Sequence, residues 1–250
     1  MQEFTTQAAI VTGAATGNGE SIARRLFAGG ASVVLVGHDG PGLEALAGSL
    51  DAGGARTAVV EGDVRAPDTM TRAVRQALDR FGALHLAVNN AGVTGPQQTL
   101  IEDLSLQDWE NVVGTDLTGM FLSLKAELPA IVASGGGAIV NLSSANGIVG
   151  VPGLAAYTCA KHGVVGLTKS VALEYADKGV RVNCIGPGYV ATPRMLQMPR
   201  TALDELAALH PLGRLAHRTE VAELTAFLLS ARAGFCTGGF YPVDGGYTAR

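Results

Sequence analysis

Short apolar runs rich in β-branched residues alternate with amphipathic stretches along the chain. An apolar run of about four to eight residues is typical of a strand buried on both faces, and apolar positions three or four apart are typical of a helix. The runs predict strands at Ala8–Thr12, Ser32–Val36, Thr57–Val60, Leu84–Asn89, Ala138–Leu142, Arg181–Ile185 and Phe240–Val243. The amphipathic stretches predict helices at Ser21–Gly29, Leu43–Leu50, Thr69–Phe81, Ser105–Val132, Ala155–Tyr175, Ala202–Leu209 and Glu220–Ser230.

Strand–helix alternation from end to end predicts an α/β fold: a single-domain, doubly wound (Rossmann) parallel sheet with helices on both faces. No linker, repeat or low-complexity segment interrupts residues 1–250, so we interpret them as one domain. The one irregular stretch is 186–211, which holds four of the ten prolines. We expect it to be a mobile flap within that domain.

Composition narrows the class of protein. With 47% hydrophobic and 16% charged residues, the 250-residue chain is neither disordered nor a charged coiled coil. A net charge of −4 predicts no nucleic-acid partner. Three cysteines without paired spacing predict neither a disulfide framework nor a metal site. With no basic leader and no apolar run of about 18 residues, we expect a soluble cytoplasmic protein without a membrane partner.

A glycine-rich turn follows the first predicted strand, with the spacing Gly13-x3-Gly17-x-Gly19. Such a turn before a helix aims backbone N–H groups and the positive helix end at a phosphate, although a plain structural turn has the same composition. The spacing resembles the cofactor loop of the short-chain dehydrogenase/reductase family, with Asn18 at a position that is usually apolar in that family. The resemblance implies cofactor contacts from Gly13, Thr16, Asn18 and Gly19.

The residues after the second strand bear on the choice between NAD and NADP. An acid there grips the adenosine ribose and selects NAD, whereas a basic residue accepts the 2′-phosphate of NADP. Gly37 stands where the family's NAD-type acid would lie, and His38 where its NADP-type arginine would lie. Asp39 comes one place later and remains within reach of a ribose. We favour NADP and keep NAD as the alternative.

Further motifs match the same family in order and spacing. Asp63 and Val64 resemble its adenine-contacting pair, and the Asn89–Gly92 stretch resembles its N-N-A-G motif, in which an asparagine amide ties neighbouring strand ends. A P-G motif follows the sixth strand. By resemblance, the remaining cofactor contacts are Asn90, Ala91, Gly92, Pro187, Gly188, Val190 and Thr192, together with Tyr157 and Lys161.

Tyr157 and Lys161 are four residues apart and therefore share one face of the predicted helix. A free tyrosine is a poor acid or base at neutral pH, and an ammonium one turn away favours its phenolate. The family has a substrate-binding serine at the offset of Ser144 and an asparagine at the offset of Asp116. Ser144, Tyr157, Lys161 and Asp116 are thus the candidate catalytic residues.

Asp116 departs from the family asparagine. If its backbone carbonyl acts by holding a water, little changes; if its side chain acts, the carboxylate competes for the Lys161 ammonium. It can also serve only to cap or bend its helix. Ser144 lacks the G-x-S-x-G surroundings of an acyl nucleophile, which argues against a hydrolase.

These motifs predict an oxidoreductase that transfers a hydride between a nicotinamide cofactor and a small ketone, aldehyde or secondary alcohol, with Tyr157 as general acid/base. The alternatives are a cofactor-binding sensor or scaffold without catalysis, and a lyase or epimerase on the same fold. The uncharged stretch 133–137 disfavours carrier-protein-bound substrates. We expect substrate contacts from Ser144, Asn146, Val151 and Tyr189.

Two expectations concern regions around this site. His210 is interpreted as a hinge or surface residue rather than a catalytic group. The resemblance implies a homotetramer or homodimer packed through the long helices. The small apolar residues of Val164–Leu173 fit such an interface and fit a core equally well.

Overall fold

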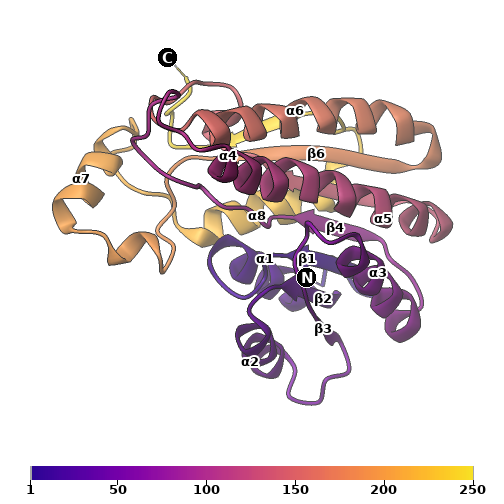
Figure 1. Cartoon of the computed structure of the whole chain (residues 1–250). Helices are drawn as coiled ribbons and strands as arrows, with labels where there is room; N and C mark the ends of the chain where they lie inside the picture. The colour runs from indigo at the N-terminus through magenta and orange to yellow at the C-terminus, as the bar shows by residue number, and fades with distance from the viewer. Residues whose placement is uncertain (1, 250) are drawn as a thin grey trace.

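The computed structural model describes residues 2–249, which form one seven-stranded sheet in the order β3-β2-β1-β4-β5-β6-β7 (Figure 1). All neighbouring strands run parallel. The strands are β1 (Ala8–Thr12), β2 (Ser32–Gly37), β3 (Thr57–Glu61), β4 (Leu86–Asn89), β5 (Gly137–Leu142), β6 (Val180–Pro187) and β7 (Phe240–Val243).

Helices connect the strands as right-handed crossovers require. They are α1 (Gly17–Ala28), α2 (Gly40–Leu50), α3 (Pro67–Phe81), α4 (Leu106–Val113), α5 (Gly119–Ala133), α6 (Ala155–Tyr175), α7 (Arg200–Ala208) and α8 (Arg218–Leu229). Short helical turns are η1 (Gly114–Thr118), η2 (Ala145–Gly147), η3 (Ala176–Lys178), η4 (Met195–Gln197) and η5 (Ala231–Ala233).

Successive strand residues point to opposite faces of the sheet, and both faces are buried. In β1, Ala9 and Val11 pack against α1, α2 and α8, whereas Ile10 packs against α3, α5 and α6. Burial on both sides explains why the strands are continuous apolar runs rather than alternating ones. The predicted doubly wound parallel sheet with two helical layers is confirmed.

The structure differs from the predicted element boundaries at two informative places. Helix α1 begins at Gly17, four residues earlier than predicted, because glycines of the loop form its first turn and glycine has a weak helix propensity. The predicted helix Ser105–Val132 is interrupted by the π-helical turn η1, which contains Asp116. Within residues 2–249, no helix combines the length and apolar character that crossing a bilayer requires.

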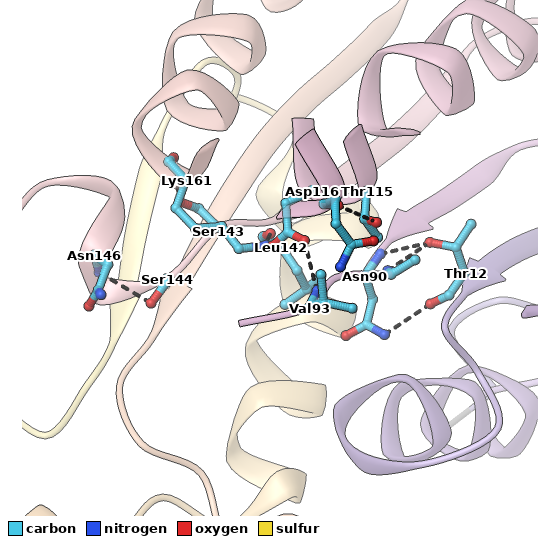
Figure 2. A network of polar contacts seen from close by, with 12 residues as sticks. Thr12, Asn90, Val93, Thr115, Asp116, Leu142, Ser143, Ser144, Asn146 and Lys161 are labelled. Carbon is cyan, nitrogen blue, oxygen red and sulfur yellow. Dashed lines mark hydrogen bonds and ion pairs between the residues drawn. The ribbon is translucent and has the colours of Figure 1, made fainter. Parts of the chain in front are cut away.

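Strand order reverses between β1 and β4, since the chain leaves β1 toward β2 and leaves β4 toward β5. In open α/β sheets a ligand crevice lies at the carboxyl ends of the strands at such a switch point. Figure 2 shows residues at the ends of β1, β4 and β5 together with Asp116 of η1 and Lys161 of α6.

Candidate active site

The loop after β1 is packed so closely that only glycine fits at two positions. Gly13 has a φ of +63°, and a Cβ there would lie 2.8 Å from Nδ2 of Asn90. A Cβ on Gly19 would overlap the carbonyl oxygen of Gly13. At these two positions the loop therefore presents backbone rather than side chains.

The start of α1 is available to an anion. Thr16 is the N-cap residue, and its side chain makes no capping hydrogen bond to the positive end of the helix. Asn18 has a buried side-chain oxygen without a hydrogen-bond partner. Thr192 faces Gly17 from the loop after β6, with its methyl carbon 3.6 Å from a Cβ placed there. Backbone donors beside an unsatisfied acceptor fit a dinucleotide, which carries phosphates and hydroxyls.

Asn90 ties β4 to the loop after β1, as the family resemblance implied (Figure 2). Its side-chain amide donates to the carbonyls of Thr12 at 2.9 Å and Gly13 at 3.2 Å. The Thr12 hydroxyl accepts from the backbone N–H groups of Asn90 and Ala91, at 2.9 and 3.0 Å. The sequence analysis missed Thr12, because a threonine at the end of a buried strand is indistinguishable from an ordinary β-branched residue.

At the predicted adenosine-binding end of the site, the carboxylates of Asp39 and Asp63 already interact with other groups of the protein. Asp39 caps α2, accepting from the backbone N–H of Gly42 at 3.0 Å. Asp63 accepts from the Arg65 guanidinium, which lowers the pKa of that carboxyl below its ordinary value despite partial burial. His38 is exposed, and a Cβ on Gly37 would meet nothing closer than Leu43 at 3.8 Å. No carboxylate therefore occupies the position of Gly37, and the one on Asp39 is committed to its helix.

Lys161 lies on the inner face of α6 and is 3% exposed. Its Nζ donates to the Leu142 carbonyl at the end of β5 at 3.0 Å (Figure 2). The same atom lies 3.0 Å from Oδ2 of Asp116 and 5.5 Å from the centre of the Tyr157 ring. Burial opposes the ammonium charge, but the carboxylate of Asp116 and the hydroxyl of Tyr157 outweigh it and raise the pKa of Lys161. Lys161 is therefore a buried cation beside Tyr157.

Asp116 is positioned by the π-helical turn η1 and is completely buried. Its Oδ1 accepts from the backbone N–H of Val93 at 2.7 Å, and its Oδ2 forms the ion pair with Lys161. The side chain of Asp116 therefore contacts the Lys161 ammonium, which is the contact that the second of the three alternatives requires. The anchoring role of Val93 was not visible in the sequence, because a backbone N–H leaves no side-chain signal.

Two adjacent serines at the end of β5 have different surroundings. The Ser143 hydroxyl is buried and donates to the Lys161 carbonyl at 3.0 Å, which fixes α6 against β5. The Ser144 hydroxyl accepts from the backbone N–H of Asn146 at 3.2 Å and caps η2. Ser144 is partly exposed, so its hydroxyl can still donate to a ligand oxygen.

Among the predicted substrate residues, Tyr189 is half-buried and lies near Tyr247 and Tyr157. Burial raises the pKa of Tyr189, with further contributions from the nearby hydroxyls of Tyr247 and Tyr157. Asn146 is buried beside Ser144. Val151 instead lines a shallow surface hollow over α6, formed with Gly150, Pro152, Ala155, Thr158, Cys159 and His162. None of the catalytic candidates lines this hollow.

His210 contradicts the surface interpretation of the sequence analysis. It is 3% exposed, because its ring is covered by Tyr189 and Tyr247 and both ring nitrogens face backbone groups. In the sequence His210 lies between a predicted helix and Pro211, where a histidine is usually part of a turn. The sequence therefore did not indicate that its ring is buried.

A buried acid beneath the site was also missed. Glu127 of α5 has no exposed surface, and burial raises its pKa to about 7, although a hydrogen bond from Asn89 opposes this. The same Asn89 amide donates to Asn141, which donates to Thr168. One oxygen each of Glu127 and Asn89 has no hydrogen-bond partner. This buried network joins β4 and β5 to α5 and α6.

Comparison with known proteins identifies the family. Residues 13–248 match a family model described as enoyl-(acyl carrier protein) reductase. The chain is 43% identical over 248 residues to the cyclohexanol dehydrogenase of Acinetobacter sp. (strain SE19), covering 99% of this chain and 97% of the relative. The chain belongs to the short-chain dehydrogenase/reductase family.

Other members are similarly close. The chain is 42% identical to the cis-4-hydroxycyclohexanecarboxylate dehydrogenase of Sinomonas cyclohexanicum, over 99% of both chains. The crystal structure of levodione reductase superposes with a TM-score of 0.92 at 35% identity, covering 98% of this chain and 99% of that one. The prediction of a nicotinamide-dependent oxidoreductase is confirmed, and each of these three relatives is named as a dehydrogenase or reductase.

Proposed function

We propose that this oxidoreductase interconverts a saturated cyclic secondary alcohol and its ketone, with NADP as the favoured cofactor and NAD as the alternative. The observation that carries the proposal is the buried Lys161 ammonium beside Tyr157, between Leu142 and Asp116. Two relatives whose names specify cyclohexane-based alcohols support the substrate class. The uncharged turn 133–137 supports a free small molecule rather than a carrier-bound one.

The roles of the side chains follow from their chemistry. Tyr157 takes the hydroxyl proton during oxidation and returns it during reduction, with the Lys161 ammonium 5.5 Å from the centre of its ring. Ser144 donates a hydrogen bond to the substrate oxygen. The bound nicotinamide supplies hydride transfer. Asp116 holds Lys161 in place through the ion pair and the Val93 anchor.

The proposed cofactor site comprises the loop after β1, the Asn90 tie and the loop after β6. Gly37 and His38 support NADP, since position 37 itself carries no acidic side chain and the Asp39 carboxylate caps α2. We further assign residues 186–211 as the substrate flap within a single domain. Support comes from α7, which buries none of its residues and lies to one side of the sheet (Figure 1), and from exposed Leu196, Met198 and Leu209.

We also propose a homotetramer or homodimer packed through α5 and α6. Leu173 on α6 is 82% exposed and Phe121 on α5 is 47% exposed, whereas Val164 and Val171 belong to the core. Light scattering of the purified protein measures the mass directly. A cytoplasmic location stays a prediction, supported by Cys159, Cys184 and Cys236, which are all free.

The test is a parallel assay of the purified protein with NADP and NAD, following absorbance at 340 nm across saturated cyclic and linear secondary alcohols. We expect turnover that is fastest with a cyclic alcohol and faster with NADP than with NAD. Faster turnover with NAD would overturn the cofactor assignment. Faster turnover with linear alcohols would overturn the substrate class while leaving the enzyme class intact.

A further inference from the structure

His210 connects the end of α7 to the loop that follows β6. Its Nε2 accepts a hydrogen bond from the backbone N–H of Tyr189 at 3.1 Å. Its Nδ1 lies 3.0 Å from the Leu206 carbonyl, one turn earlier in the chain. One imidazole thus joins the last turn of α7 to Tyr189, the residue assigned to the substrate.

These two contacts define the state of the ring. A nitrogen that accepts from an N–H must carry a lone pair, so Nε2 is unprotonated and the proton of the neutral ring lies on Nδ1. Nδ1 then donates to Leu206. Both nitrogens are satisfied, as buried polar groups must be, and no other side chain in the surroundings makes a hydrogen bond to the Tyr189 N–H.

The ring is also a packing surface for the loop. A Cβ on Gly188 would lie 2.6 Å from Nε2, so the backbone before Tyr189 rests directly on the imidazole. The Tyr189 ring meets it edge-on, with centroids 5.7 Å apart and an interplanar angle of 86°. The Tyr247 ring contacts both of them, with its centroid 5.6 Å from that of His210 and 6.2 Å from that of Tyr189. Tyr189 is therefore held by its backbone and by its ring.

We propose that His210 is a positioning residue that fixes Tyr189 beside Tyr157, and that it thereby sets the affinity for the non-reacting part of the alcohol. The proposal rests on the function proposed above, because it takes Tyr189 as a substrate contact. His210 itself touches neither the reacting atoms nor the catalytic side chains.

The experiment compares His210→Gln with His210→Leu in the full-length protein. The glutamine amide oxygen reaches the place of Nε2 and can accept from Tyr189, whereas leucine cannot. A matched control is His85→Leu, because Nδ1 of His85 also accepts a backbone N–H, that of Ala8, at 3.2 Å and at the opposite end of the sheet. Hydrogen exchange of the segment 186–192 is measured together with kcat and KM for the best cyclic alcohol.

We expect His210→Leu to speed exchange at Tyr189 roughly tenfold, because a buried N–H loses its partner. KM for the alcohol should rise roughly five- to tenfold while kcat stays within about threefold, because the variant loses binding energy that the ground state and the transition state share. His210→Gln should restore both, and His85→Leu should change neither.

Three results would overturn the proposal. Unchanged exchange in His210→Leu would mean that His210 does not hold Tyr189. Faster exchange with an unchanged KM would mean that it holds Tyr189 without affecting the substrate, and a loss of kcat equal to the rise in KM would indicate general damage. If the wild-type protein oxidises no alcohol, the proposed function fails instead, and the exchange comparison still decides whether His210 anchors the loop.

Discussion

The two walls of the active-site crevice are built in different ways. The wall formed by the loop after β1 consists of backbone and glycine, tied down by Asn90. The wall formed by η1, β5 and α6 consists of buried polar and charged side chains, with Lys161 and Asp116 almost entirely removed from water. The first wall requires that positions 13 and 19 carry no side chain. The second wall requires side chains that are charged or exchange protons.

This difference predicts two kinds of sensitivity. On the glycine wall an added methyl group should weaken cofactor binding at every pH, because the cause is steric. On the charged wall, isosteric changes that remove a charge should alter rates or stability in a pH-dependent way. The following variants test that division.

The largest effect is expected for Tyr157→Phe, which removes the proposed acid/base group and keeps the ring. Turnover should fall by at least about a hundredfold, roughly 3 kcal/mol in the barrier, while cofactor affinity is unchanged. Steady-state kinetics and a cofactor titration measure the two quantities. Tyr175→Phe, at the far end of the same helix, is the matched control. Near-normal turnover of Tyr157→Phe would remove Tyr157 from the reaction.

The next largest effect concerns the acid beneath the charged wall. Burial raises the pKa of Glu127 from 4.5 to about 7, so its contribution to stability is full below pH 4.5 and is lost as the pH rises toward 7. Glu127→Gln cannot ionise. The free energy of unfolding of the variant minus that of wild type should therefore be about 3 kcal/mol larger, in favour of the folded variant, at pH 8 than at pH 4.

Urea denaturation at the two pH values measures this difference. Glu174→Gln, an exposed position on α6, should show almost no pH-dependent change. A Glu127→Gln profile parallel to that of wild type would show that Glu127 does not titrate in this range, and would break the contrast between the walls.

Gly19→Ala tests the glycine wall. The new methyl group would overlap the Gly13 carbonyl oxygen and displace the start of α1. We expect the cofactor Kd to rise roughly thirtyfold, about 2 kcal/mol, equally at pH 6 and pH 8. Gly48→Ala on α2 is the control, because a Cβ there meets nothing within 4 Å. Unchanged affinity in Gly19→Ala would mean that the loop yields to the methyl group.

The smallest effect is expected for Asp116→Asn. The asparagine oxygen can still accept from the Val93 N–H, so η1 keeps its anchor, and only the charge facing Lys161 is lost. Turnover at neutral pH should stay within about tenfold, about 1.4 kcal/mol. The surface variant Asp177→Asn controls for charge alone. A gain of a hundredfold or more would mark Asp116 as an impairment, and an equal loss would make its carboxylate essential.

How far the sequence could predict these walls depends on what builds them. The glycine turn at Gly13 and Gly19 could be predicted, because a close approach of two backbone segments requires glycine and the glycines recur at a fixed spacing in the sequence. Tyr157 and Lys161 were predictable because a helix places i and i+4 on one face. Glu127 and Thr12 were not, since an acid within an apolar helix or a threonine in a strand has no local feature that reveals its partners.

The sequence by itself determined the alternation of strands and helices, the doubly wound sheet and the order of the cofactor and catalytic motifs. Each of these follows from local periodicity or fixed spacing along one element. Only the tertiary structure decided that Asp116 pairs with Lys161, that Ser143 rather than Ser144 fastens α6, and that His210 is buried against Tyr189. Those contacts join segments 18 to 45 residues apart, and their energies depend on burial, which no single segment encodes.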